Sequence, residues 1–231
     1  MVIYALYAII HRNFSEVKML TEQILKVTSF GAEFILWLLI FLFAVEIAII
    51  IERVIFYSKF KLNLKEFNEK YKELLLEGKI TELEKKLRNL KTFETYALLQ
   101  GVKVMKNGAA SVEEAVEAAK GENRIALEKN LTVLGTLGSN TPFIGLFGTV
   151  VGIIKAFKDL AAASKGGEML KHGQASVMAG ISEALVATGV GLLVAIPAVI
   201  AFNYFMRKVK VINQNTDVLT SLFMSYLKKE K

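Results

Sequence analysis

Residues 177–205 read VMAGISEALVATGVGLLVAIPAVIAFNYF, and this stretch decides the class of fold. Glu183 is its only charged residue. A helix of about 20 apolar residues crosses the hydrocarbon core of a bilayer. Because lipid cannot hydrogen-bond open backbone groups, such a segment crosses the membrane as a helix. The stretch therefore predicts a transmembrane helix that is longer than the bilayer requires.

Two more stretches have the same character. Residues 34–52 begin with the aromatic side chains Phe34 and Trp37, which are typical of the membrane interface. Residues 131–157 contain Lys155 as their only charged residue. Its long side chain can extend from the end of this stretch to the membrane–water interface. The sequence therefore predicts an all-α integral membrane protein with three long transmembrane helices.

The composition supports this class and argues against several others. Hydrophobic residues make up 53% of the chain, and the net charge of +7 comes from cations that flank the apolar stretches. That placement is typical of a membrane protein rather than of a nucleic-acid-binding one. The chain has no cysteine, and His11 and His172 lack metal-ligand spacing. No phosphate-binding loop or catalytic triad is present, so we expect no cofactor, no metal and no enzymatic activity.

Lysine and arginine near the ends of the three stretches predict the orientation. They place the segment after the first span and the C-terminus in the cytoplasm. The expected organisation is an N-terminal periplasmic or interfacial helix (1–33), a first span (34–52), a cytoplasmic helical domain (53–130), a second span (131–157), a short periplasmic loop (158–176), a third span (177–205) and a C-terminal cytoplasmic helix (206–231).

Helical periodicity outside the spans predicts two further features. Ser111 followed by Glu114 fits a capping box at the start of a helix. An apolar stripe with steps of three and four residues follows the third span, which favours packing on partner helices. Its members are Val209, Ile212, Thr216, Leu219, Phe223 and Tyr226.

Small residues and prolines mark the second and third spans. Glycines let membrane helices approach closely, and simple helix packing is the interpretation that we favour for them. The two prolines each remove a backbone donor and are expected to bend their helices. The packing candidates are Gly145, Gly148, Gly152 and Gly191, and the bend candidates are Pro142 and Pro197.

Three polar residues within the spans are candidates for an ion pathway: Thr149, Glu183 and Thr188. A carboxyl group in a bilayer is costly and commonly marks a proton path, although it can also pin helices together. The threonine hydroxyls can line such a path or simply bond to their own helices. Glu183 and Thr188 lie roughly 140° apart around an ideal helix, so they are not expected to point the same way. For Glu46, in the first span, functional and structural roles remain equally open.

Two long motifs in this order carry a family resemblance. PFIGLFGTVVGII from Pro142 and GISEALVATGVGLLVAIP ending at Pro197 resemble the ExbB/TolQ family, to which the flagellar stator protein MotA is more distantly related. The three-span order and Glu52-Arg53 at the end of the first span extend the resemblance. A flagellar role is not favoured, because MotA-like proteins have a fourth span.

The resemblance implies a homopentamer in the bacterial inner membrane with a central pore lined by the second and third spans. An ExbD- or TolR-like single-span partner would sit in the pore, and a TonB- or TolA-like protein would carry the output to the outer membrane. It also implies that Thr149, Glu183 and Thr188 serve proton passage in a motor driven by the proton-motive force. ExbB-like import, TolQ-like envelope maintenance and a non-conducting structural scaffold remain alternatives.

Overall fold

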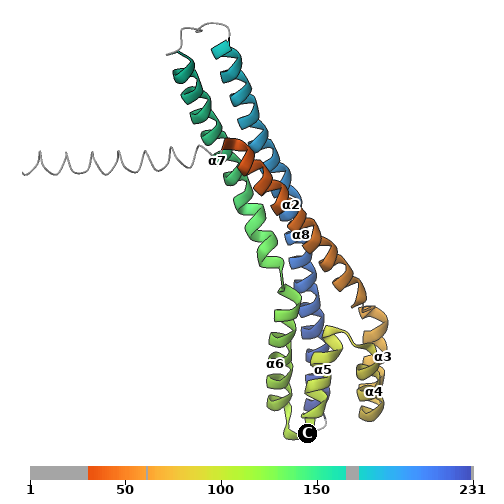
Figure 1. The fold of residues 1–231 in the computed structure, drawn as a ribbon. Helices are drawn as coiled ribbons and strands as arrows, with labels where there is room; N and C mark the ends of the chain where they lie inside the picture. The colour runs from red at the N-terminus through yellow and green to blue at the C-terminus, as the bar shows by residue number, and fades with distance from the viewer. Residues whose placement is uncertain (1–30, 61, 165–171, 230–231) are drawn as a thin grey trace, which may run out of the picture. The chain divides into compact units, whose positions relative to one another are not determined.

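The computed structural model describes residues 31–60, 62–164 and 172–229, and most of these residues are helical. Figure 1 shows α2 (Gly31–Lys59), α3 (Leu64–Leu76), α4 (Ile80–Leu90), α5 (Phe93–Lys103), the short 3-10 helix η2 (Met105–Asn107), α6 (Ala109–Glu128), α7 (Leu131–Ser164) and α8 (His172–Lys229). No strand occurs in these three ranges, so the all-α prediction is confirmed. The expected N-terminal helix lies outside the described residues except for 31–33, and so does much of the loop 158–176.

Two stretches of the described chain are long and apolar enough to cross a membrane. One lies within Glu33–Leu76, a range that includes most of α2, and the other lies within Val177–Lys228 of α8. α7 is not among them, and its first turns contain Thr132, Ser139 and Asn140. Two spans are therefore supported by length and composition, and the third, over α7, remains a prediction.

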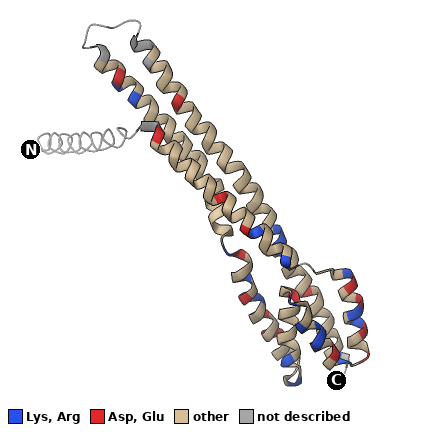
Figure 2. Ribbon diagram, turned by 45° about the vertical axis from the view of Figure 1, so that its right-hand side comes forward, with Lys and Arg blue, Asp and Glu red and all other residues tan. Residues whose placement is uncertain are grey.

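The contacts divide the chain into two compact units. The first contains residues up to Glu46 together with Thr136–Val199, and the second contains Ile47–Gly135 with Ile200–Lys231. In the first unit, Ile35 and Leu39 of α2 are buried with Val151 of α7. Figure 2 shows that this unit carries few charged residues, whereas α3, α4 and α6 carry many.

The second unit has two apolar clusters. One is formed by α3 to α6 with the last turns of α8, and its members include Tyr71, Leu83, Leu98, Val116 and Phe223. The other contains Tyr57, Leu127, Leu131, Leu134 and Phe205. Burying such side chains is worth about 1.5–3 kcal/mol each before the entropy of ordering them is considered, so these clusters are the main source of stability in this unit.

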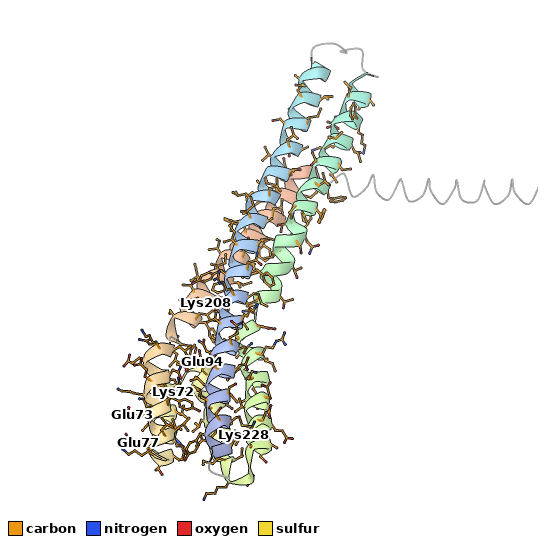
Figure 3. All side chains as sticks on the ribbon, turned by 180° about the vertical axis from the view of Figure 1, so that it is seen from behind. Lys72, Glu73, Glu77, Glu94, Lys208 and Lys228 are labelled. Carbon is orange, nitrogen blue, oxygen red and sulfur yellow. The ribbon has the colours of Figure 1, made fainter. Side chains whose placement is uncertain are left out.

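Two buried charged groups in the second unit find partners. Arg53 is 1% exposed, and its guanidinium pairs with Glu52, donates to the Ala126 carbonyl at 3.3 Å and lies 4.4 Å from the centre of the Phe56 ring. Glu94, labelled in Figure 3, accepts a hydrogen bond from Asn215 Nδ2 at 3.4 Å. These contacts tie α2 to α6 and α5 to α8.

The predicted capping box at Ser111 and Glu114 is wrong. α6 begins after Gly108, whose φ of +99° favours glycine, and Ser111 Oγ instead donates to the Asn107 carbonyl. A capping box does occur at the start of α5, where Thr92 Oγ1 accepts from the Thr95 backbone N–H and Thr95 Oγ1 accepts from the Thr92 N–H. Thr95 replaces the usual Glu or Gln there, which hid the motif in the sequence.

The expected division between a third span and a separate C-terminal helix is not observed, because α8 is one helix of 58 residues. Residues 206–229 contain neither glycine nor proline, so nothing in the local sequence ends the helix. The apolar stripe of this segment is buried at Val209, Thr216, Leu219 and Phe223. Leu219 and Phe223 pack within the α3–α6 cluster of the same chain rather than on partner helices.

Lys120 connects α6 to α8 and gives a testable pH dependence. Its Nζ donates to Asp217 at 2.5 Å and to Glu117 at 2.6 Å. Burial acts to lower the pKa of Lys120, but these two hydrogen bonds outweigh it and raise the pKa above 10.5. A raised lysine pKa gives stability that is fully present below pH 10.5 and is lost as the pH rises through the folded-state value.

We expect Lys120→Met to cost about 1 kcal/mol or less at pH 8, because the group is only partly buried. Thermal unfolding of the wild type and the variant, followed by circular dichroism, should show this difference at pH 8 and its disappearance well above pH 10.5. Lys103→Met, which removes an exposed cation that donates a hydrogen bond to the neutral Gln100 side chain, is the control. An equal difference at both pH values would mean that Lys120 contributes through packing rather than charge.

Candidate functional site: polar groups between α7 and α8

Glycines bring α7 and α8 into backbone contact in the first unit. A Cβ added to Gly191 would lie 2.7 Å from the Thr141 carbonyl oxygen, and one added to Gly145 would lie 2.8 Å from the Ala187 carbonyl oxygen. A Cβ on Gly148 would lie 2.9 Å from the Ala187 Cβ. Real side-chain atoms do not approach so closely, so the two helices reach this separation only because these positions lack a side chain.

This close approach places two hydroxyl groups together. Thr149 Oγ1 of α7 lies 2.5 Å from Thr188 Oγ1 of α8. Both oxygens also lie within reach of the Gly145 carbonyl oxygen, at 3.3 Å from Thr149 and 3.2 Å from Thr188. The three oxygens form one polar contact point between the two helices.

The two hydroxyl groups at this contact point can form either of two hydrogen-bond patterns. Each threonine hydroxyl carries one proton to donate and two lone pairs to accept. One hydroxyl can donate to the Gly145 carbonyl while the other donates to the first hydroxyl. The reverse pattern fits the same geometry, so the pair can exchange direction by rotating two O–H bonds, which is what a proton relay requires.

Glu183 does not join the two threonines. Its side chain is exposed on α8 of the isolated chain and lines a separate cavity with Lys155 and Asp159 of α7. This placement agrees with the angular separation expected of Glu183 and Thr188. The sequence identified Glu183, but it gave no sign that Lys155 and Asp159 face the same cavity, because that depends on how α7 and α8 are aligned.

The remaining sequence candidates lie within the same two helices. Gly152 is buried and lines the Glu183 cavity. Pro142 lies inside α7 and Pro197 inside α8, and both helices continue through them. Within the described ranges, no group of three or more His, Asp or Glu residues is placed to hold a metal ion.

Glu46 of α2 is the most unusual polar residue of the first unit. It is 0% exposed, and neither carboxyl oxygen has a hydrogen-bond partner among the described residues. An ionised carboxylate in such surroundings is strongly disfavoured. Among the described residues, no group stabilises a charge on the Glu46 carboxyl.

Replacing Glu46 tests the cost of this burial. We expect Glu46→Met to raise the thermal unfolding midpoint of the detergent-solubilised protein, because it removes an unpartnered buried group worth about 1–3 kcal/mol. Glu46→Gln keeps a polar group of similar shape and should give no such gain. A lower midpoint for Glu46→Met, measured by circular dichroism, would mean that the carboxyl group has a stabilising partner.

These features define a class of protein: an all-helical chain with long apolar helices, two of which hold polar groups at a close contact. The comparison with known families makes this specific. The MotA/TolQ/ExbB proton channel family matches residues 89–217, more than half of the chain. The chain belongs to this family, and the matched region contains Thr149, Glu183 and Thr188.

The similar proteins include some that are named ExbB and one that is named TolQ. The chain is 46% identical over 94 residues to the biopolymer transport protein ExbB-like 2 of Helicobacter pylori and 43% identical over 93 residues to an ExbB of the same species. It is 43% identical over 97 residues to the Tol-Pal system protein TolQ of Pseudomonas aeruginosa.

These matches are partial on both sides. They cover 41%, 40% and 42% of this chain and 59%, 60% and 39% of the respective relatives. The chain thus covers less than two thirds of the length of each relative.

Proposed function

We propose that this protein is a proton-channel subunit of an inner-membrane motor that uses the proton-motive force to energise processes at the outer membrane. The observation that carries the proposal is the Thr149–Thr188 hydroxyl pair, with its 2.5 Å separation. A hydrogen-bonded hydroxyl pair that can reverse its direction, held between two membrane helices, fits proton transfer. Membership of the proton channel family supports the same conclusion.

The proposed topology has three spans, formed by α2, α7 and α8. The N-terminus and the loop 158–176 lie in the periplasm, whereas the helical segment 53–130 and the C-terminus lie in the cytoplasm. Arg53, Lys59 and Lys65 after the first span, and Arg207 and Lys208 after the third, support this orientation.

The proposed assembly is a homopentamer with a central pore lined by α7 and α8. Apolar side chains on these helices are exposed in the isolated chain, among them Phe143 at 69% and Leu193 at 60%. Such a surface needs lipid or protein to cover it. In the proposal, neighbouring copies, the bilayer and the single span of an ExbD- or TolR-like partner do so.

The output of the motor is proposed to pass through a TonB-like protein for active import, as in an ExbB-like system. A TolQ-like role in envelope maintenance, with a TolA-like partner, is the alternative, because relatives of both names match to similar extents. A gene for a TonB-like or a TolA-like protein beside this one would favour the corresponding role.

A non-conducting scaffold is the second candidate function, and the glycine contacts between α7 and α8 are the observation that favours it. The two functions differ in what they require of the polar groups. A scaffold needs the glycines but neither the hydroxyl pair nor Glu183. A channel needs all three features.

Co-expression with the candidate single-span partner tests the proposal. Native mass spectrometry of the purified complex should give five copies of this chain. In import or envelope-integrity assays, the complex should function when the proton-motive force is present and fail when it has collapsed. A complex that supports full function after a protonophore has dissipated the proton gradient would contradict it.

A further inference from the structure

The cavity beside Glu183 differs in chemistry from the threonine contact. Its volume is about 200 Å³, enough to hold several water molecules. The residues that line it are Gly152, Lys155, Ala156 and Asp159 of α7 with Ala179, Gly180 and Glu183 of α8. Four of the seven are glycine or alanine, so the walls are short and the charged side chains dominate the surface. No described residue of α2 lines it.

The three charged side chains come from facing helices. Lys155 and Asp159 are four residues apart and therefore share one face of α7. Glu183 lies opposite them on α8. None of the three forms an ion pair with another described residue, so their charges act on the cavity itself. A Cβ on Gly180 would lie 2.8 Å from the Ala156 Cβ, which shows how closely the two helices meet beside it.

The charge balance of the cavity fits a single proton. With all three groups ionised, one ammonium faces two carboxylates, and the net charge is that of one carboxylate. A proton bound to a carboxylate oxygen of Glu183 makes the cavity neutral. Without the ammonium, two carboxylates would remain, and paired oxygen ligands are what hard metal cations prefer.

We propose that Lys155 is the specificity-determining residue of this cavity, which selects a proton over a sodium or potassium ion at Glu183. The Lys155 ammonium lines the same cavity as the two carboxylates, so a metal cation that filled its coordination shell there would lie in a confined space beside a fixed like charge. A proton needs no coordination shell, since it forms an O–H bond with one carboxylate oxygen. This inference rests on the proposed function for its purpose, although its test does not.

The test uses the full-length protein in lipid and follows sodium binding by perfusion infrared spectroscopy. Sodium chloride is exchanged for choline chloride at constant ionic strength, so that screening does not change. Sodium bound at a carboxylate alters the carboxylate stretching bands. We expect no sodium-induced bands in the wild type and clear bands in Lys155→Gln, with apparent sodium affinity raised about tenfold or more.

Two controls locate the effect. Lys158→Gln removes a nearby cation that does not line the cavity and should behave as the wild type does. The double variant Lys155→Gln/Glu183→Gln should lose the bands that Lys155→Gln gains.

Sodium-induced bands of equal strength in the wild type, or no bands in Lys155→Gln, would overturn the proposal. Because the readout is ion binding, it is independent of whether the protein drives a motor. Loss of energised function in Glu183→Gln tests the proposed function separately.

Discussion

Glu183→Gln should abolish energised function while the complex still assembles. Glutamine has nearly the same shape as glutamate but cannot hold and release a proton. Glu183 is exposed on α8 of the isolated chain and is not part of its packed core, so the substitution should leave the fold intact. The measurement is complementation of a strain that lacks the native gene, by growth or envelope integrity, with blue native electrophoresis to follow assembly.

Thr188→Val should give a smaller loss. It removes one hydroxyl of the pair and leaves Thr149 with the Gly145 carbonyl oxygen as its partner. The lost hydrogen bond is worth about 0.5–1.5 kcal/mol, which corresponds to roughly two- to 13-fold in rate. Thr141→Val is the matched control, because the Thr141 hydroxyl donates at 2.8 Å only to Leu137 of its own helix. It should keep nearly full activity.

Glu33→Gln, an amide substitution on α2 away from the Glu183 cavity, controls for the loss of a carboxylate. Full activity in both Glu183→Gln and Thr188→Val would refute the channel proposal and favour the scaffold. Loss of assembly in both would place these groups in helix packing instead.

Gly191→Ala is expected to have the largest effect on stability. The new methyl group would lie 2.7 Å from the Thr141 carbonyl oxygen and 3.0 Å from the Gly145 Cα, so the helices must separate. Overpacking of this kind costs about 1–3 kcal/mol. Separation would also break the Thr149–Thr188 hydrogen bond, so activity should fall with stability. Gly145→Ala, which meets the Ala187 carbonyl oxygen at 2.8 Å, should behave alike.

Gly189→Ala makes a sharp control because a Cβ at Gly189 meets nothing within 4 Å. Alanine favours a helix over glycine by about 1 kcal/mol, so this variant should be slightly more stable. Thermal unfolding midpoints would then shift in opposite directions for positions 189 and 191. Shifts of the same sign would show that the α7–α8 contact at Gly191 has room for a methyl group.

Much of the architecture could be predicted from local sequence. The apolar stretches 34–52 and 177–205 are helical, as hydropathy predicts, because the length and composition of a segment determine whether it can lie in lipid. Gly145 and Gly148 of α7, which the sequence offers as packing candidates, lie against Ala187 of α8. The angle between Glu183 and Thr188 follows from helix geometry alone, and the structure places the two side chains in different surroundings.

What could not be predicted depends on pairing between distant segments. The Thr149–Thr188 contact joins residues 39 positions apart, and periodicity within one helix says nothing about its register on another. The same limit hid the cavity that Lys155 and Asp159 share with Glu183. The continuity of α8 beyond residue 205 was missed because a change from apolar to charged residues looks like a boundary, although it does not stop a helix.

The burial of Leu219 and Phe223 among α3 to α6 has a consequence for biosynthesis. Val112 and Val116 belong to the same core, yet the ribosome must add about 100 more residues before Leu219 and Phe223 exist. At roughly 5–20 residues per second, this takes about 5–20 s. During that interval, in the proposed topology, α7 and the first part of α8 enter the bilayer while the nascent α3–α6 segment lacks the part of α8 that completes its apolar cluster. Premature termination near the end of the gene should therefore yield a chain that inserts but is cleared by quality-control proteases.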